Sequence, residues 1–322
     1  MPVVSSKIKR SPFWLINGHF QSVYPSLYRQ VDGVTYERER LTLKDGDFVD
    51  LDWQDQGNDK LLIISHGLEG NSNRQYVKGA AKLFAQNGWD ILAWNCRSCS
   101  GEMNRAFRLY HHGDIDDISE VIAHAQKRKD YRQISLMGHS MGGSITLKYI
   151  GTKGNNLDKN IKSATVFSVP FDLEAGADIL NKRSNKLYYD KFLSKLQPKI
   201  EYKDRAYPGR LDTSNFDRIE VWRDFDEFFS APMNGYRDAA DFYEQSSAIN
   251  YIDGINIPTL ACNAQNDPIL PKECYPTEAC SNHPHLYLEI PKTGGHCGFL
   301  QPGDEFAYSE RRALEFVENS HR

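Results

Sequence analysis

Short apolar runs alternate with amphipathic stretches along most of the chain. A run such as 61–65 (LLIIS) has the length and composition of a strand buried on both faces, whereas 115–127 has the apolar spacing of a helix. The predicted strands are 41–43, 48–53, 61–65, 91–94, 134–137, 164–168, 258–263 and 286–290, and the predicted helices are 76–86, 115–127, 144–150 and 305–319. This order predicts a single α/β domain over residues 1–322, in which helices cover both faces of a mostly parallel sheet.

Residues 171–235 break this alternation. They contain a helix-like stretch at 173–196 and a polar, aromatic-rich stretch at 210–229. An insertion at the carboxyl edge of a sheet is a common position for a lid, so we predict that 171–235 forms a helical cap within the domain. Aromatic side chains of this insertion either line an acyl pocket or pack the cap onto the core; they are Tyr188, Tyr189, Phe192, Trp222, Phe225, Phe228 and Phe229.

The chemistry is suggested first by residues 138–142, which read Gly-His-Ser-Met-Gly between a predicted strand and a predicted helix. A Gly-x-Ser-x-Gly turn in this context holds its serine in a strained conformation with the hydroxyl exposed at the strand tip. The glycines avoid collisions across the sharp bend. We therefore predict that Ser140 is a nucleophile. The alternative is a glycine-rich turn that has no chemical role.

A serine hydroxyl is a poor nucleophile unless a base takes its proton. His296 is the predicted base, because it lies in a glycine-rich loop after the last predicted strand and can reach back over the sheet to Ser140. Asp267 follows the preceding strand and is the expected acid that orients the imidazole. The alternatives are a loop histidine that caps a backbone group and an Asp-Pro turn. Asp253 and Glu273 are less well placed acids.

The strand predicted at 61–65 ends in His66-Gly67-Leu68, where one backbone N–H of an oxyanion hole is expected. The residue after the nucleophile supplies the second N–H, so Leu68 and Met141 are the predicted pair. His66 itself has the donor atoms of a metal ligand. A lone histidine before a glycine nevertheless favours a structural role, and no metal is expected.

The charge balance argues against several classes of partner. The chain has 322 residues with 39 Lys+Arg and 43 Asp+Glu, a net charge of −4, so neither nucleic acid nor anionic lipid is favoured as a primary partner. There is no run of 18 apolar residues, and no transmembrane segment is expected. The stretch 13–16 (FWLI) is too short for the core of a signal peptide. We expect it to pack against the domain, with peripheral contact to a membrane as the alternative.

Six scattered cysteines do not form a disulfide framework, and Cys96-x-x-Cys99 lacks a second Cys/His pair at metal-ligand spacing. We therefore expect reduced thiols, a cytoplasmic location and no cofactor. Asp114, Asp116 and Asp117 open a predicted helix, where carboxylates are favourable. They are interpreted as capping residues rather than as metal ligands.

Several of these segments together resemble α/β-hydrolase family 4, the group that contains bacterial YheT-like hydrolases and eukaryotic medium-chain esterases. The resemblance covers nearly the whole chain. The segments that carry it are 17–22 (NGHFQS), 66–70 (HGLEG), 138–142 (GHSMG), 168–173 (SVPFDL), 267–268 (DP) and 294–299 (GGHCGF). The chain departs from the family at Ser98, where the family usually has Gly after an arginine, and at Asn266, where relatives often have a second Asp.

The resemblance implies the α/β-hydrolase fold and hydrolysis of carboxylic esters with short or medium acyl chains, within lipid metabolism. Some members are acylglycerol lipases or transfer acyl groups to alcohols, and the fold alone does not fix the substrate. The sequence therefore favours a serine carboxylesterase that acts on a small-molecule ester. An acyltransferase is the nearest alternative, and a non-catalytic ligand-binding module is a weaker one.

Overall fold

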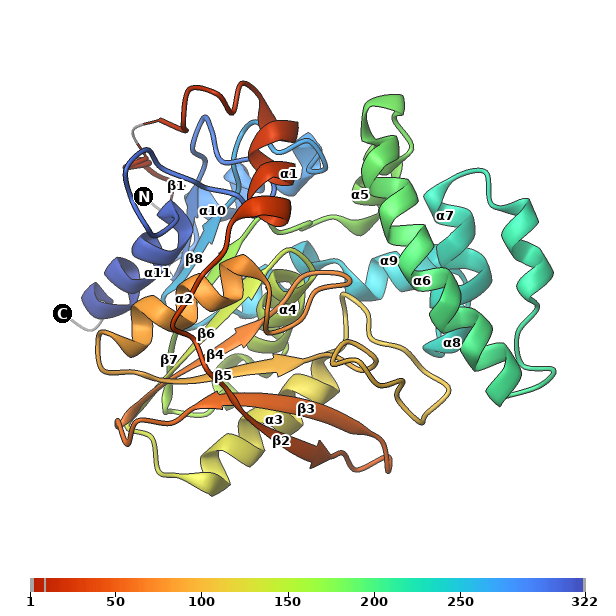
Figure 1. Cartoon of the computed structure of the whole chain (residues 1–322), viewed down its shortest axis with the longest axis horizontal. Helices are drawn as coiled ribbons and strands as arrows, with labels where there is room; N and C mark the ends of the chain where they lie inside the picture. The colour runs from red at the N-terminus through yellow and green to blue at the C-terminus, as the bar shows by residue number, and fades with distance from the viewer. Residues whose placement is uncertain (1–2, 9, 321–322) are drawn as a thin grey trace.

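A twisted, mostly parallel sheet forms the centre of the computed structural model, which describes residues 3–8 and 10–320. Within these residues the strand order is β1-β9-β8-β7-β6-β4-β5-β3-β2 (Figure 1). The pairs from β1 to β5 are parallel, and only β5–β3 and β3–β2 are antiparallel among the described strands. The strands are β1 Val3–Val4, β2 Glu37–Thr42, β3 Phe48–Gln54, β4 Lys60–Ser65, β5 Asp90–Asn95, β6 Gln133–His139, β7 Ile161–Phe167, β8 Thr259–Cys262 and β9 Leu286–Glu289.

Helices cover both faces of the sheet, which confirms the predicted α/β architecture. In β4, Leu61 and Ile63 pack with α3 and α4, whereas Leu62 and Ile64 pack with α2 and α11. This burial on both sides explains the unbroken apolar run of the strand. The helices are α1 Gly18–Tyr28, α2 Gln75–Ala85, α3 Ile115–Arg128, α4 Met141–Lys153, α5 Leu173–Leu180, α6 Lys186–Ala206, α7 Trp222–Phe225, α8 Ala231–Met233, α9 Ala239–Ser246, α10 Thr277–Ser281 and α11 Tyr308–Asn319.

Helices α5 to α9 lie together beyond one edge of the sheet, between β7 and β8 in the chain (Figure 1). They form an apolar cluster of their own, separate from the two clusters on the faces of the sheet. The stretch 173–196, predicted as one helix, is divided between α5 and α6 because the chain turns after Asn181, whose side chain accepts a hydrogen bond from the Trp222 N–H (2.8 Å). The helical region also continues past residue 235, to the end of α9 at Ser246.

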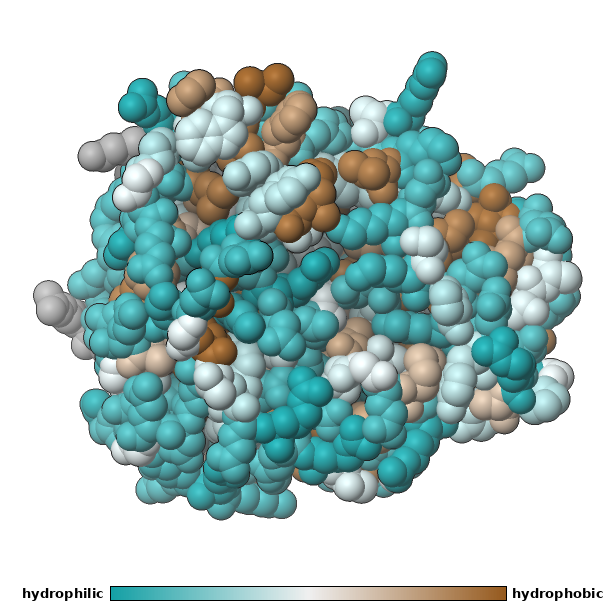
Figure 2. All heavy atoms as spheres, viewed as in Figure 1, coloured by the Kyte–Doolittle hydropathy of each residue, from teal (hydrophilic) through white to brown (hydrophobic). Residues whose placement is uncertain are grey.

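The N-terminal segment differs from expectation. Helix α1, which the sequence analysis did not predict, is capped by Asn17, whose side chain accepts a hydrogen bond from the Phe20 N–H (3.0 Å). Before it, Phe13 is 89% exposed and Ile16 is 74% exposed, and of the predicted apolar stretch Leu15 alone is buried. The expectation that 13–16 packs against the domain was therefore wrong for most of this stretch. Figure 2 shows apolar side chains gathered at the top of the molecule, where α1 lies.

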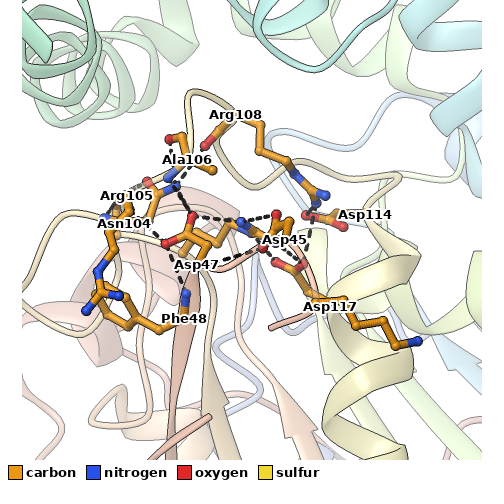
Figure 3. Close-up of polar contacts among 12 residues, drawn as sticks. Asp45, Asp47, Phe48, Asn104, Arg105, Ala106, Arg108, Asp114 and Asp117 are labelled. Carbon is orange, nitrogen blue, oxygen red and sulfur yellow. Dashed lines mark hydrogen bonds and ion pairs between the residues drawn. The ribbon is translucent and has the colours of Figure 1, made fainter. Parts of the chain in front are cut away.

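A buried ionic cluster holds the long loop that follows β5 (Figure 3). The Arg97 guanidinium donates two hydrogen bonds to Asp117 (both 2.7 Å) and one to Asp47 (2.7 Å). Asp47 also accepts a hydrogen bond from the Asn104 side chain (2.7 Å). From α6, the Lys203 ammonium donates to the backbone oxygen of Asn104 (2.6 Å), so this cluster also anchors the helical insertion.

This cluster changes the interpretation of Asp114 and Asp117 as capping residues, and it also shows how the chain accommodates Ser98. Asp114 occupies the N-cap position of α3 but its side chain makes no capping bond; it pairs with Arg108 (2.5 Å), as Asp117 pairs with Arg97. These carboxylates bind arginines because buried charges need partners. Ser98 stands where the family usually has glycine, and its φ of +61° is a conformation that favours glycine. Its hydroxyl donates a hydrogen bond to the Asn104 side chain (2.6 Å).

Each of the six cysteines lies in the described part of the chain and is a buried free thiol, as the sequence predicts. None of the described helices is both long enough and apolar enough to cross a bilayer.

Candidate active site

Ser140 lies at the sharp turn between β6 and α4. Its φ of +53° and ψ of −121° are unusual for a non-glycine residue. The turn is possible because its glycines permit very close backbone contacts. A Cβ on Gly138 would lie 2.3 Å from the Gly142 oxygen, and a Cβ on Gly142 would lie 2.3 Å from the Ser65 oxygen. The local sequence thus builds the strained turn that the motif predicts.

The side chains of Ser140, His296 and Asp267 form one hydrogen-bonded chain. His296 Nε2 lies 3.0 Å from Ser140 Oγ, and His296 Nδ1 lies 2.9 Å from Asp267 Oδ2. The Asp267 carboxylate is buried, and its other oxygen accepts a hydrogen bond from the Ile269 N–H (3.1 Å). In the described structure neither Asp253 nor Glu273, the less favoured acids, bonds to His296.

The environment of His296 makes its imidazole a stronger base. Burial opposes protonation, but the charge of Asp267 and its hydrogen bond outweigh burial and raise the pKa of His296 above its usual value. The neutral ring can therefore take a proton from Ser140 more readily than an isolated imidazole could.

The segment after β4 lies directly against the nucleophile turn. A Cβ on Gly67 would lie 3.1 Å from the Cβ of Ser140, so the next residue, Leu68, is brought beside the serine. Among the described residues, the backbone N–H groups of Leu68 and Met141 donate no hydrogen bond. The two predicted oxyanion donors are thus near Ser140 and available to a ligand.

His66 shapes this segment from behind. Its Nε2 accepts a hydrogen bond from the Cys96 N–H (3.0 Å), so Nδ1 carries the proton that is donated to the Gly67 oxygen (2.8 Å). Burial lowers the pKa of His66 to about 4, and the ring is neutral at physiological pH. No group of metal-ligating side chains is found in residues 3–8 and 10–320. Both nitrogens of His66 are thus engaged in holding the loop.

Helix α1 supports the two loops that carry the acid and the base, which sequence reasoning missed. Gln21 Oε1 accepts hydrogen bonds from the Gly294 N–H (2.8 Å) and from the Asn266 side chain (2.9 Å). Ser22 Oγ accepts a hydrogen bond from the His296 N–H (2.7 Å). The segment 17–22 was noted only as part of a family pattern. Its polar residues Gln21 and Ser22, inside a largely apolar stretch, were the available signal.

An apolar cavity opens beside Ser140 and His296. Its walls come mainly from the helical insertion, with residues such as Leu180 and Ile200. The aromatic side chains of the insertion differ in whether they reach this cavity. Phe192, Trp222 and Phe225 line this cavity, whereas Tyr189, Phe228 and Phe229 do not.

One wall of this cavity carries a buried carboxyl group, that of Asp226. The Ser230 hydroxyl (2.6 Å) and the Tyr243 hydroxyl (2.8 Å) donate hydrogen bonds to it. Burial, partly offset by these bonds, raises the pKa of Asp226 to about 6. Asp226 begins a π-helical turn, Asp226–Ser230, and such turns occur often at functional sites.

Residues 60–302 match the family model described as alpha/beta hydrolase fold. The chain belongs to the α/β-hydrolase family. Its relatives include the YheT protein of Escherichia coli (strain K12), a candidate esterase, which is 33% identical over 290 residues, 88% of this chain and 84% of that protein. Phospholipase ABHD3 of Bos taurus is 28% identical and aligns with 88% of this chain and 72% of its own length.

The Pyrococcus furiosus esterase Pf2001 has a solved structure that is similar to this α/β-hydrolase. The TM-score is 0.60, with 19% identity, over 90% of this chain and 96% of the other. At this identity the similarity shows a common fold.

A second cavity of this α/β-hydrolase meets the first at Ser140 and His296. Its walls include the cationic side chains of Arg74, Lys191 and Lys195. Ser140 therefore lies between an apolar cavity and a cationic one.

Proposed function

We propose that this α/β-hydrolase is a serine carboxylesterase that cleaves esters of short or medium acyl chains. The observation that carries the proposal is the hydrogen-bonded chain from Asp267 through His296 to Ser140, at the mouth of an apolar cavity. The names of YheT and ABHD3, an esterase and a phospholipase, support ester hydrolysis as the class of reaction.

In the proposed acylation step, His296 Nε2 takes the proton of Ser140 as Oγ attacks the ester carbonyl carbon. Asp267 holds the imidazole in the required tautomer and stabilises its protonated form. The N–H groups of Leu68 and Met141 donate to the oxyanion of the tetrahedral intermediate. His296 then gives its proton to the leaving alcohol, and an acyl-enzyme on Ser140 remains.

In deacylation, His296 takes a proton from water as the water oxygen attacks the acyl carbon. The intermediate collapses, His296 returns the proton to Ser140 and the carboxylic acid leaves. The proposed cycle needs no metal or organic cofactor.

The helical insertion acts in this proposal as a cap over the acyl group. Residues 171–235, together with α9, supply most of the apolar wall, and an acyl chain bound there would remove apolar surface from water. Lys203 anchors α6 to the loop after β5 and so fixes the position of this cap relative to the sheet.

The proposal is tested by hydrolysis of p-nitrophenyl esters with acyl chains from acetate to laurate. We expect a maximum at short or medium length in the wild type, and a fall in kcat of about 10⁴-fold or more in Ser140→Ala and His296→Ala. Ser194→Ala, which alters an exposed serine of α6, is the matched control. Near-normal turnover by Ser140→Ala would overturn the mechanism.

A further inference from the structure

The second cavity is placed to receive the part of the ester that leaves as the alcohol. It shares Leu68, Ser140 and His296 with the apolar cavity, so a substrate carbonyl at Ser140 can extend into both. An acyl chain favours the apolar cavity because its burial there is favourable. The second cavity then faces the alcohol portion.

Three cations of this cavity have no counter-ion. Arg74 lies just before α2, and Lys191 and Lys195 are four residues apart on α6, on the same face of the helix. Within the described structure none of the three forms an ion pair, and the buried Arg74 Nε has no hydrogen-bond partner. The Lys195 ammonium reaches only a backbone oxygen, that of Glu69, at 3.5 Å.

The acidic group in the cavity wall is already engaged. The Glu69 carboxylate accepts a hydrogen bond from the Lys199 ammonium (2.7 Å) and another from the Tyr110 hydroxyl. It is therefore paired with a fourth cation and leaves the charge of the other three uncompensated.

The uncompensated charge acts on Lys191. Burial lowers the pKa of Lys191, and the nearby charges of Arg74 and Lys195 lower it further. The first turn of α2, which borders the cavity at Gln75 and Tyr76, has no acidic residue and no side-chain cap. Its positive end adds to the same field. In a chain of net charge −4, this is a local concentration of positive charge.

We infer that this cavity binds a phosphate group carried by the alcohol portion of the ester, held by Arg74, Lys191 and Lys195. The position of the ester in this inference rests on the proposed function, whereas the anion site rests on the cations of the cavity itself. Arg74 offers a planar fork of N–H donors, and each lysine offers three further donors. A phosphate monoester has more non-bridging oxygens and more charge than a carboxylate, so it matches three cations that line one cavity better.

The first test compares two soluble esters with the same acyl group, 1-butyrylglycerol and 1-butyrylglycerol 3-phosphate. We expect kcat/KM to be at least about tenfold higher for the phosphate ester, and Arg74→Gln to reduce this ratio by about tenfold, toward equal rates for the two esters. Lys191→Gln and Lys195→Gln should each reduce it as well. Lys186→Gln, which alters an exposed cation of α6 outside the cavity, should leave the ratio unchanged.

Hydrolysis of 1-butyrylglycero-3-phosphocholine, measured in parallel, distinguishes a phosphate within a lipid headgroup from a free terminal phosphate. A preference shared by this diester supports a lipid headgroup as the ligand, and a preference confined to the monoester supports a free terminal phosphate. A matched ester of glyceric acid tests the carboxylate. Equal acceleration by that ester would overturn the assignment to phosphate.

The second test does not depend on turnover. Calorimetric titration of Ser140→Ala with glycerol 3-phosphate should show saturable binding, and Arg74→Gln in that background should abolish it. Binding without esterase activity in the wild type would refute the proposed function and retain the anion site. Esterase activity without a preference for the phosphate ester and without binding of glycerol 3-phosphate would refute the anion site alone.

Discussion

Gln21 gives the sharpest test of how the fold positions the reacting groups. Its side chain is buried and accepts hydrogen bonds from Gly294 and Asn266, and it donates one to the Leu15 oxygen (2.9 Å). Gln21→Met removes these bonds while nearly keeping the volume and length of the side chain. The change therefore releases the loops of His296 and Asp267 without opening a large cavity.

The magnitude follows from the groups that lose their partner. The buried Gly294 N–H and the half-buried Asn266 amide lose their acceptor, and the Leu15 oxygen loses its donor. At about 1–3 kcal/mol for each fully buried group, the free energy of unfolding should fall by about 2–6 kcal/mol. Asn266 adjoins Asp267, and Gly294 precedes His296 by two residues. A displacement of about 1 Å at a reacting group can lower the rate by about 100-fold. We therefore expect kcat to fall by about 10- to 100-fold, with a smaller change in KM.

The assay measures kcat, KM and the pH profile with p-nitrophenyl butyrate, beside thermal unfolding. A looser contact between His296 and Asp267 should also move the pH inflection downward, which a general loss of stability would not do. Leu27→Ala, at an exposed position of the same helix, is the control. A lowered Tm with unchanged kcat and inflection would refute a positioning role for Gln21.

Three further predictions concern pH and the apolar cavity. Because only neutral His296 accepts a proton, kcat/KM should rise with pH to an inflection above about 6.5, and Asp267→Asn should lower both that inflection and kcat, the latter by about 10⁴-fold. Asp226 has a raised folded-state pKa, so its contribution to stability is complete below about pH 4 and is lost as pH rises to about 6. Between these pH values the free energy of unfolding of the wild type should fall by about 3 kcal/mol because of Asp226, and Asp226→Asn should lack this fall. Urea unfolding across the pH range measures it, and identical profiles of wild type and variant would contradict the prediction. Ala177→Phe should fill part of the apolar cavity and shift the p-nitrophenyl ester maximum to a shorter chain, and an unchanged maximum would place the acyl group elsewhere.

The sheet and the nucleophile turn could be predicted because their signals are local. The run 61–64 is apolar throughout since it is buried on both faces, and the glycines at 138 and 142 are required by contacts within one turn and with the neighbouring strand. The chain order of Ser140, Asp267 and His296 could likewise be inferred from the strand each one follows, and the structure brings the three together.

The parts that were missed depend on contacts between distant segments. Helix α1 contains Gly18 and Pro25, which weaken a helical pattern, and its Gln21 is explained only by loops near the other end of the chain. The cationic cavity joins Arg74 to lysines of α6, and no sequence pattern links them. One boundary was missed for a local reason: helix α11 begins at Tyr308 rather than at 305, because the Glu310 side chain bonds back to the Ala307 N–H (2.9 Å).

Intact-mass measurement after incubation with a fluorophosphonate tests the central claim most directly, since the reagent bonds covalently to an activated serine. We expect a single adduct on the wild type and none on Ser140→Ala, with much slower labelling of His296→Ala because the base is lost. An adduct of equal extent on Ser140→Ala would place the reactive serine elsewhere. A wild type that stays unlabelled would contradict an activated nucleophile at this turn.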